Sequence, residues 1–180
     1  FDCLELLSLG TNDSLNVYGE PLVGEMASFI YRMHIDGEWY VNFADASARV
    51  KPSPFLVHRF GDRVGDAKMS SFGASLLARS HTSRVESLQR YLPVLFSGDD
   101  DAVHGAAYPY ESQVWLDKIE VMCARESAGT PRGFYLGAKG GHNAESHNHN
   151  DVGTFIVYND GRPLIVDAGV GTYTRRTFSN

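Results

Sequence analysis

The feature that most restricts the fold of this chain is a pair of apolar runs near its end, divided by a tight turn. The runs are Thr154–Tyr158 and Pro163–Asp167, with Asn159-Asp160-Gly161 between them. Short apolar runs on either side of an Asn/Asp/Gly turn are typical of a β-hairpin. Both faces of the first run are apolar, so we expect a strand buried inside a sandwich of two sheets.

The length of this turn decides on which face of the hairpin Asp167 lies. A two-residue loop would place Asp167 opposite Thr154, whereas a three-residue loop, Asn159-Asp160-Gly161, would place it opposite Gly153. We predict the three-residue loop, because it puts Asp167 diagonally next to Asp151 and within reach of a shared ion.

Histidines gather directly before the hairpin. Three of the chain's seven, His142, His147 and His149, lie within eight residues. In an extended backbone alternate side chains share a face, so His147, His149 and Asp151 would form one row. Zinc binds imidazole nitrogen and carboxylate oxygen, which makes His149 and Asp167 candidate ligands. The residues alone leave a catalytic cluster and a structural metal clip both open.

The run KGGHNAESHNHNDVGTFIVYNDGRPLIVDAGVGTYT closely resembles the heparinase II/III-like family of polysaccharide lyases, most specifically over residues 139–178. In that family, helical hairpins form an α/α toroid, an antiparallel β-sandwich follows, and the active cleft lies between them. The resemblance implies a multidomain, α-then-β chain. Residues 1–104 would be the C-terminal part of the toroid-like domain, and residues 105–180 the first strands of the sandwich.

The resemblance also assigns roles to individual residues. His147 matches a catalytic position that handles a proton or the uronate carboxylate, and His149 and Asp167 match the ligands of a bound zinc. The family's third zinc ligand lies further along than Asn180, and its catalytic tyrosine lies upstream of Phe1. We therefore expect a middle piece of a larger enzyme that is inactive in isolation.

The charge of the chain restricts its partners. A net charge of −6 argues against a nucleic-acid surface. Cations nevertheless cluster around the histidines, where they would suit an acidic polysaccharide, although exposed turns collect such residues too. These cations are Arg132, Lys139, Arg162, Arg175 and Arg176. We assign Lys139, Asn148 and Arg162 to substrate binding, and expect no membrane span because no apolar run is long enough.

Apolar spacing predicts helices before about residue 104. One segment opens at Pro21 and carries an expected core stripe of Leu22, Met26, Phe29, Ile30 and Met33. The stretch with Pro52 and Pro54 is interpreted as a loop. A turn at His81-Thr82, followed by a capping box at Ser83 and Glu86, predicts an αα-hairpin.

Strands are predicted after the acidic break Ser97–Asp101, the expected domain boundary. Alternation begins at Gln113, and a turn leads into a strand at Phe134–Lys139, which gives at least four strands with the hairpin. Cys3 and Cys123 lack the spacing of a zinc or redox pair, so we expect each to be a small buried side chain.

Three functions follow from these observations. The favoured one is β-elimination of a uronic-acid polysaccharide of the glycosaminoglycan or alginate type. The second is metal-dependent hydrolysis suggested by HNHND, although such sites need further ligands and residue 152 is Val. The third is a non-catalytic glycan-binding or structural module. The resemblance implies secretion or a bacterial periplasm, and the sequence leaves the substrate, endolytic or exolytic action, and oligomeric state open.

Overall fold

A computed structural model describes residues 1–79, 106–144, 147, 149–169 and 171. The chain divides into two compact units, each discontinuous in sequence. Unit 1 comprises Phe1–Arg32 and Lys51–Tyr110, and unit 2 comprises Met33–Val50 and Glu111–Asn180. Sequence analysis had placed residues 33–50 in the helical domain, but they associate with the strands. The predicted boundary near residues 97–104 lies outside the described residues.

Unit 1 contains the described helices: α1 (Asp2–Gly10), α2 (Pro21–Arg32), α3 (Pro54–Val64) and α4 (Ala67–Arg79). The prediction of a loop around Pro54 is wrong, because Pro54 begins α3. Proline is favoured at the first helical position because its missing N–H is unpaired there in any helix, and Pro54 occupies the start of α3 in this way. The helical hairpin predicted around His81-Thr82 lies outside the described residues.

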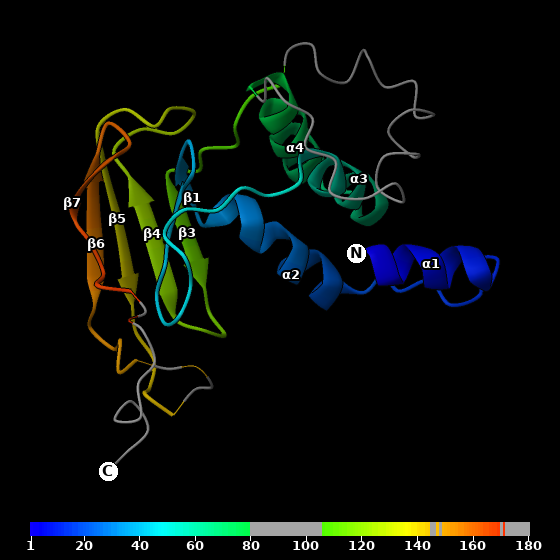
Figure 1. Cartoon of the computed structure of the whole chain (residues 1–180), viewed down its shortest axis with the longest axis horizontal. Coiled ribbons are helices and arrows are strands. Elements are labelled where there is room, and N and C mark those ends of the chain that lie inside the picture. Colours follow the sequence, from blue (N-terminus) through cyan, green and yellow to red (C-terminus); the bar gives the residue numbers. More distant parts are fainter. Residues whose placement is uncertain (80–105, 145–146, 148, 170, 172–180) are drawn as a thin grey trace. The chain divides into compact units, whose positions relative to one another are not determined.

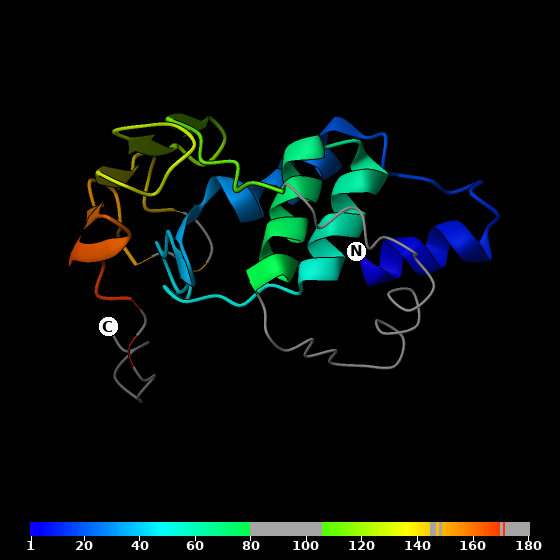
Figure 2. The same cartoon turned by 90° about the horizontal axis from the view of Figure 1, so that it is seen from above.

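Helices α3 and α4 form an αα-hairpin of their own (Figure 2). The turn is short because Gly65 adopts φ 70° at the end of α3 and the Asp66 carboxylate accepts the first backbone N–H groups of α4. Glycines let the backbones meet: a Cβ on Gly73 would lie 2.3 Å from the backbone N of His58. This helix crossing therefore requires glycine.

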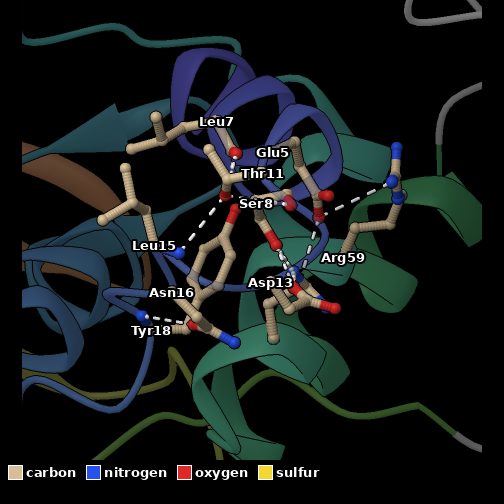
Figure 3. A network of polar contacts seen from close by, with 10 residues as sticks. Glu5, Leu7, Ser8, Thr11, Asp13, Leu15, Asn16, Tyr18 and Arg59 are labelled. Atoms are coloured by element: carbon tan, nitrogen blue, oxygen red, sulfur yellow. Dashed lines mark hydrogen bonds and ion pairs between the residues drawn. The ribbon is translucent and has the colours of Figure 1, made fainter.

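A polar network ties α1 and the loop after it to α3 (Figure 3). Arg63 lies 3.2 Å from the Glu5 carboxylate and donates to the Ser8 hydroxyl at 2.6 Å. Ser8 in turn donates to Asp13, and this bond lowers the pKa of the Asp13 carboxyl. Arg63 also lies over the Tyr18 ring, 4.5 Å from its centroid. These contacts hold α1 and the loop after it against α3, so we assign the network a structural role.

The predicted core stripe is buried only at its last member, Met33, which follows α2 and is 1% exposed; within the helix the stripe is not the buried side. Leu22 and Met26 are 64% and 69% exposed, and Phe29 is also exposed. The smaller side chains of Ala27 and Ser28, together with Tyr31, are buried instead. Helical spacing predicted the helix correctly but could not show which side faces the rest of the unit.

The described residues of unit 2 form seven strands: β1 (His34–Asp36), β2 (Trp39–Tyr40), β3 (Gln113–Leu116), β4 (Val121–Arg125), β5 (Phe134–Lys139), β6 (Phe155–Asn159) and β7 (Arg162–Ile165). β1 and β2 form a small hairpin. β3 to β7 form one antiparallel sheet in sequence order (Figure 1). Helices followed by an antiparallel sheet are thus observed, whereas the toroid and the second sheet of a sandwich stay predictions.

The turn between β6 and β7 differs from the predicted one. Asn159 pairs with Arg162, so the loop has two residues, Asp160 and Gly161, with φ of 49° and 71°. These positive values are those of a tight hairpin turn. A register shift then pairs Val157 with Ile165. The prediction of a three-residue loop was wrong. The prediction treated loop length as the only cause of the register, whereas here an irregularity within the strands changes the register beyond a two-residue loop.

The two faces of the five-stranded sheet differ in burial. On one face Val121, Cys123, Tyr135, Ile156 and Tyr158 are each less than 5% exposed. Residues of the β1–β2 segment pack there, since the Trp39 ring lies 6.0 Å from that of Tyr158. The opposite face exposes large apolar side chains, namely Trp115, Phe134, Leu136, Phe155 and Ile165. β6 is therefore covered on one side only among the described residues.

The cysteines lie in opposite environments. Cys123 is buried in the sheet core as predicted, and burial raises the pKa of its thiol to about 11. Cys3 on α1 is exposed, which corrects the expectation that both are buried. Neither forms a disulfide.

Candidate functional site

The histidine loop, defined as residues 140–154, connects β5 to β6 in unit 2. At its base, Gly153 N donates to the Lys139 carbonyl and Lys139 N to the Thr154 carbonyl, which prolongs the β5–β6 pairing. Val152 N donates to the Asn143 side chain at 3.3 Å, across the loop. The sheet and this cross-link hold both ends of the loop.

Between these ends the backbone departs from an extended strand at two described residues. His147 and Asn150 have φ of 58° and 62°, in the left-handed region. The prediction of a single row formed by His147, His149 and Asp151 is therefore wrong, because that row needs an extended strand. His147 and His149 are exposed, while Asp151 is buried.

His147 meets a carboxylate that the sequence analysis did not select. Its Nδ1 lies 2.5 Å from Oδ2 of Asp45, which is in the segment following β2. The two residues are 102 positions apart in sequence. A carboxylate only accepts hydrogen bonds, so Nδ1 carries the hydrogen in this contact and Nε2 remains as the second ring nitrogen. No local pattern indicates such a pair.

Asp151 holds the same segment from its buried position. Its Oδ2 accepts a hydrogen bond from Ala44 N at 2.6 Å, and the residue is 5% exposed. Ala44 itself has φ 60°, a conformation that an L side chain rarely adopts. Asp151 thus stabilises the bend that directly precedes Asp45.

The end of the hairpin approaches this segment as well. Asp167 Oδ1 accepts from Gly169 N at 2.7 Å, and a Cβ on Gly169 would lie 3.6 Å from the Asn42 amide nitrogen. His147, Asp151 and the Asp167–Gly169 turn thus lie near the buried or bent segment of residues 42–45. The sequence analysis had grouped the histidine loop with Asp167 and had not selected residues 42–45.

Among the residues that the structure describes, the predicted metal ligands His149 and Asp167 are not part of a three-ligand group. Within the described part of the chain no cluster of three or more His, Cys, Asp or Glu side chains is arranged to bind an ion. His149 is exposed and Asp167 is half-buried. They supply two donor types that suit zinc, and a complete tetrahedral site needs donors beyond these two.

Two of the predicted substrate-binding residues, Lys139 and Arg162, lie at opposite ends of the strands of the sheet. Lys139 is 8% exposed, and its ammonium group donates to the carbonyls of Ile119 and Gly140 at 2.9 and 3.3 Å. Arg162 is exposed at the start of β7. Asn148 lies outside the described residues. The contacts of Lys139 are structural ones, and substrate contacts by all three residues stay predictions.

Comparison with known proteins supports the resemblance drawn from the sequence. Residues 134–180 match the family model described as "Heparinase II/III-like, C-terminal". No curated protein matches the chain. The matched segment contains β5, the histidine loop, β6 and β7. Residues 134–180 are thus similar to the heparinase II/III-like C-terminal family, which is the family that the sequence predicted.

Among the described residues, none of the helices combines the length and apolar character that crossing a membrane requires.

Proposed function

We propose that this chain is part of a polysaccharide lyase that cleaves a uronic-acid-containing acidic polysaccharide by β-elimination. The observation that carries the proposal is the heparinase II/III-like match, which includes the whole histidine loop. Glycosaminoglycans and alginate are the substrate types that fit, and a secreted or periplasmic location would suit such polymers. The toroid-like helical domain belongs to the same proposal.

The reaction would run without a net change of oxidation state. A base removes the C5 proton of the uronate, the electron pair forms the C4–C5 double bond, and the bond from C4 to the leaving oxygen breaks. An acid protonates that oxygen. A cation or hydrogen-bond donor near the carboxylate stabilises the charge that develops on it. We assign His147 to proton transfer or to carboxylate neutralisation, since its side chain is 70% exposed and its ring has a second nitrogen, Nε2, besides the one that contacts Asp45.

We further propose that His149 and Asp167 supply two of the ligands of a zinc ion that fixes the loop. When bound, the ion would hold the imidazole and the carboxylate together, a supporting rather than a chemical role. Metal analysis of the natural protein that contains this chain, and of its His149→Ala variant, tests this. Loss of stoichiometric zinc with a lower melting temperature is expected, and unchanged zinc content would contradict the assignment.

The reaction itself is tested by incubating the natural protein with heparan sulfate and alginate, with a neutral glucan as control. The ultraviolet absorbance of an unsaturated product should rise with a uronate polymer and stay flat with the glucan. New reducing ends without unsaturation would favour the hydrolase instead. Binding without any cleavage would favour the non-catalytic glycan-binding module.

A further inference from the structure

We propose that Asp45 is a positioning residue for His147: its carboxylate fixes the ring's orientation and its Nδ1–H tautomer, and so presents Nε2 to the substrate. This inference rests on the proposed lyase function. Asp45 precedes the family-matched segment by many residues, so the match assigns it no role. The contact of 2.5 Å between Oδ2 and Nδ1 is what brings it to the site.

The tautomer follows from the contact. A neutral imidazole has one N–H and one lone pair, and the partner of one nitrogen decides which nitrogen carries the hydrogen. Here the Asp45 carboxylate retains the hydrogen on Nδ1. Nε2 is then the nitrogen that exchanges a proton with the substrate.

Asp45 is mounted on a rigid segment. Val41, Asn42 and Phe43, which precede Ala44 and Asp45, are each at most 9% exposed. Ala44 is fixed in the left-handed region by the bond from its N–H to the buried Asp151 carboxylate. Because its backbone is already fixed, the Asp45 carboxylate loses little conformational freedom when it binds the His147 ring. It is therefore suited to orienting that ring.

Stability alone does not account for this pair. The side chains of His147 and Asp45 are 70% and 36% exposed, and exposed ion pairs contribute little to folding. The backbone is nonetheless strained on both sides of the contact. His147 has φ 58° and Ala44, next to Asp45, has φ 60°, and such values cost free energy in residues other than glycine. Strain of this kind concentrates where a side chain has to be aimed.

Three variants of the natural protein test the role. Asp45→Asn retains size but replaces the obligate acceptor with an amide that can donate to Nδ1. Asp45→Glu restores a carboxylate on a longer side chain. Asp117→Asn is the matched control, since Asp117 is exposed and its 3.4 Å ion pair is with Lys118, outside the histidine loop.

Two readouts separate orientation from general damage. The first is turnover on a uronate polymer, divided into kcat and KM. The second is the ¹⁵N chemical shifts of the His147 ring in the chain itself, which report its tautomer at a pH well above the ordinary histidine pKa of about 6.5. The tautomer readout does not depend on activity.

We expect Asp45→Asn to lower kcat by about 10- to 100-fold while KM changes by less than about 3-fold. The shifts should show loss of the Nδ1–H form, Asp45→Glu should recover part of kcat, and Asp117→Asn should match the parent. A full kcat in Asp45→Asn, or an unchanged tautomer, would overturn the role of Asp45. A parent protein without unsaturated product would overturn the lyase function instead, and the shifts would still decide whether Asp45 orients the ring.

Discussion

The α3–α4 crossing and the histidine loop are both tightly held, but by opposite means. In the crossing, helices adjacent in sequence meet backbone to backbone at Gly61 and Gly73, inside unit 1. In the loop, the exposed His147 contacts Asp45 and the buried Asp151 binds Ala44 N, each partner being more than a hundred positions away in sequence. Close packing of the first kind favours stability, whereas strained backbone that aims polar groups is typical of functional sites.

The largest expected effect on folding is at the helix crossing. Gly73→Ala would place a Cβ 2.3 Å from the His58 backbone, which cannot move without separating α3 from α4. We expect a loss of about 3 kcal/mol in the free energy of unfolding. Urea denaturation measures it, and the ¹⁵N shifts of His147 should be unchanged in the variant that remains folded.

Gly24→Ala on α2 is the control for Gly73→Ala. A Cβ there would meet nothing within 4 Å. Alanine is the better helix former, so the free energy of unfolding should rise by about 0.5–1 kcal/mol. Equal destabilisation by both substitutions would contradict the account of the crossing.

An intermediate effect is expected where the loop is anchored. Asp151→Ala would remove the acceptor of Ala44 N and leave a backbone donor unpaired, at a cost of about 1–3 kcal/mol. Hydrogen exchange at Ala44 should accelerate, and the Asp45–His147 contact should weaken with it. Asp160→Ala, in the β6–β7 turn, removes a comparable bond to Gly133 N without touching residues 42–45. If the two variants altered the His147 shifts equally, Asp151 would not be the anchor.

The smallest effect concerns the sheet beneath the loop. The pKa of Cys123 is raised to about 11 from its ordinary 9.0, so the folded state disfavours the thiolate. The free energy of unfolding should therefore fall as pH rises from 9 towards 11, by about 1 kcal/mol at pH 10. Denaturation at pH 8 and pH 10 measures this fall. Cys123→Ala, compared with the parent, should show a shallower one, and an equal slope would contradict the assignment.

Local rules predicted much of the fold. Apolar spacing indicated α2, alternation indicated the strands that begin at Gln113, and an apolar run beside a tight turn indicated β6, because these elements are determined by their own residues. Pro54 was misinterpreted since proline both interrupts and starts helices. The exposed stripe of α2 and the bulge in β7 depend on neighbouring elements, which spacing does not report.

The site was predictable only in part. The motif drew attention to His147, and the family match covers it. Its partner Asp45 was missed because the contact joins residues 102 positions apart, and a single Asp after an apolar run has no distinctive pattern. Positive φ at His147 and Asn150 was missed because neither residue requires it.

The central claim is that His147 serves chemistry rather than folding. The most direct test compares the natural protein with its His147→Ala variant. Formation of unsaturated product from a uronate polymer and the melting temperature are measured for both proteins. The account predicts a loss of turnover of about 100-fold or more with a nearly unchanged melting temperature. Near-normal turnover, or unfolding of the variant, would contradict it and leave the histidine loop as a structural clip.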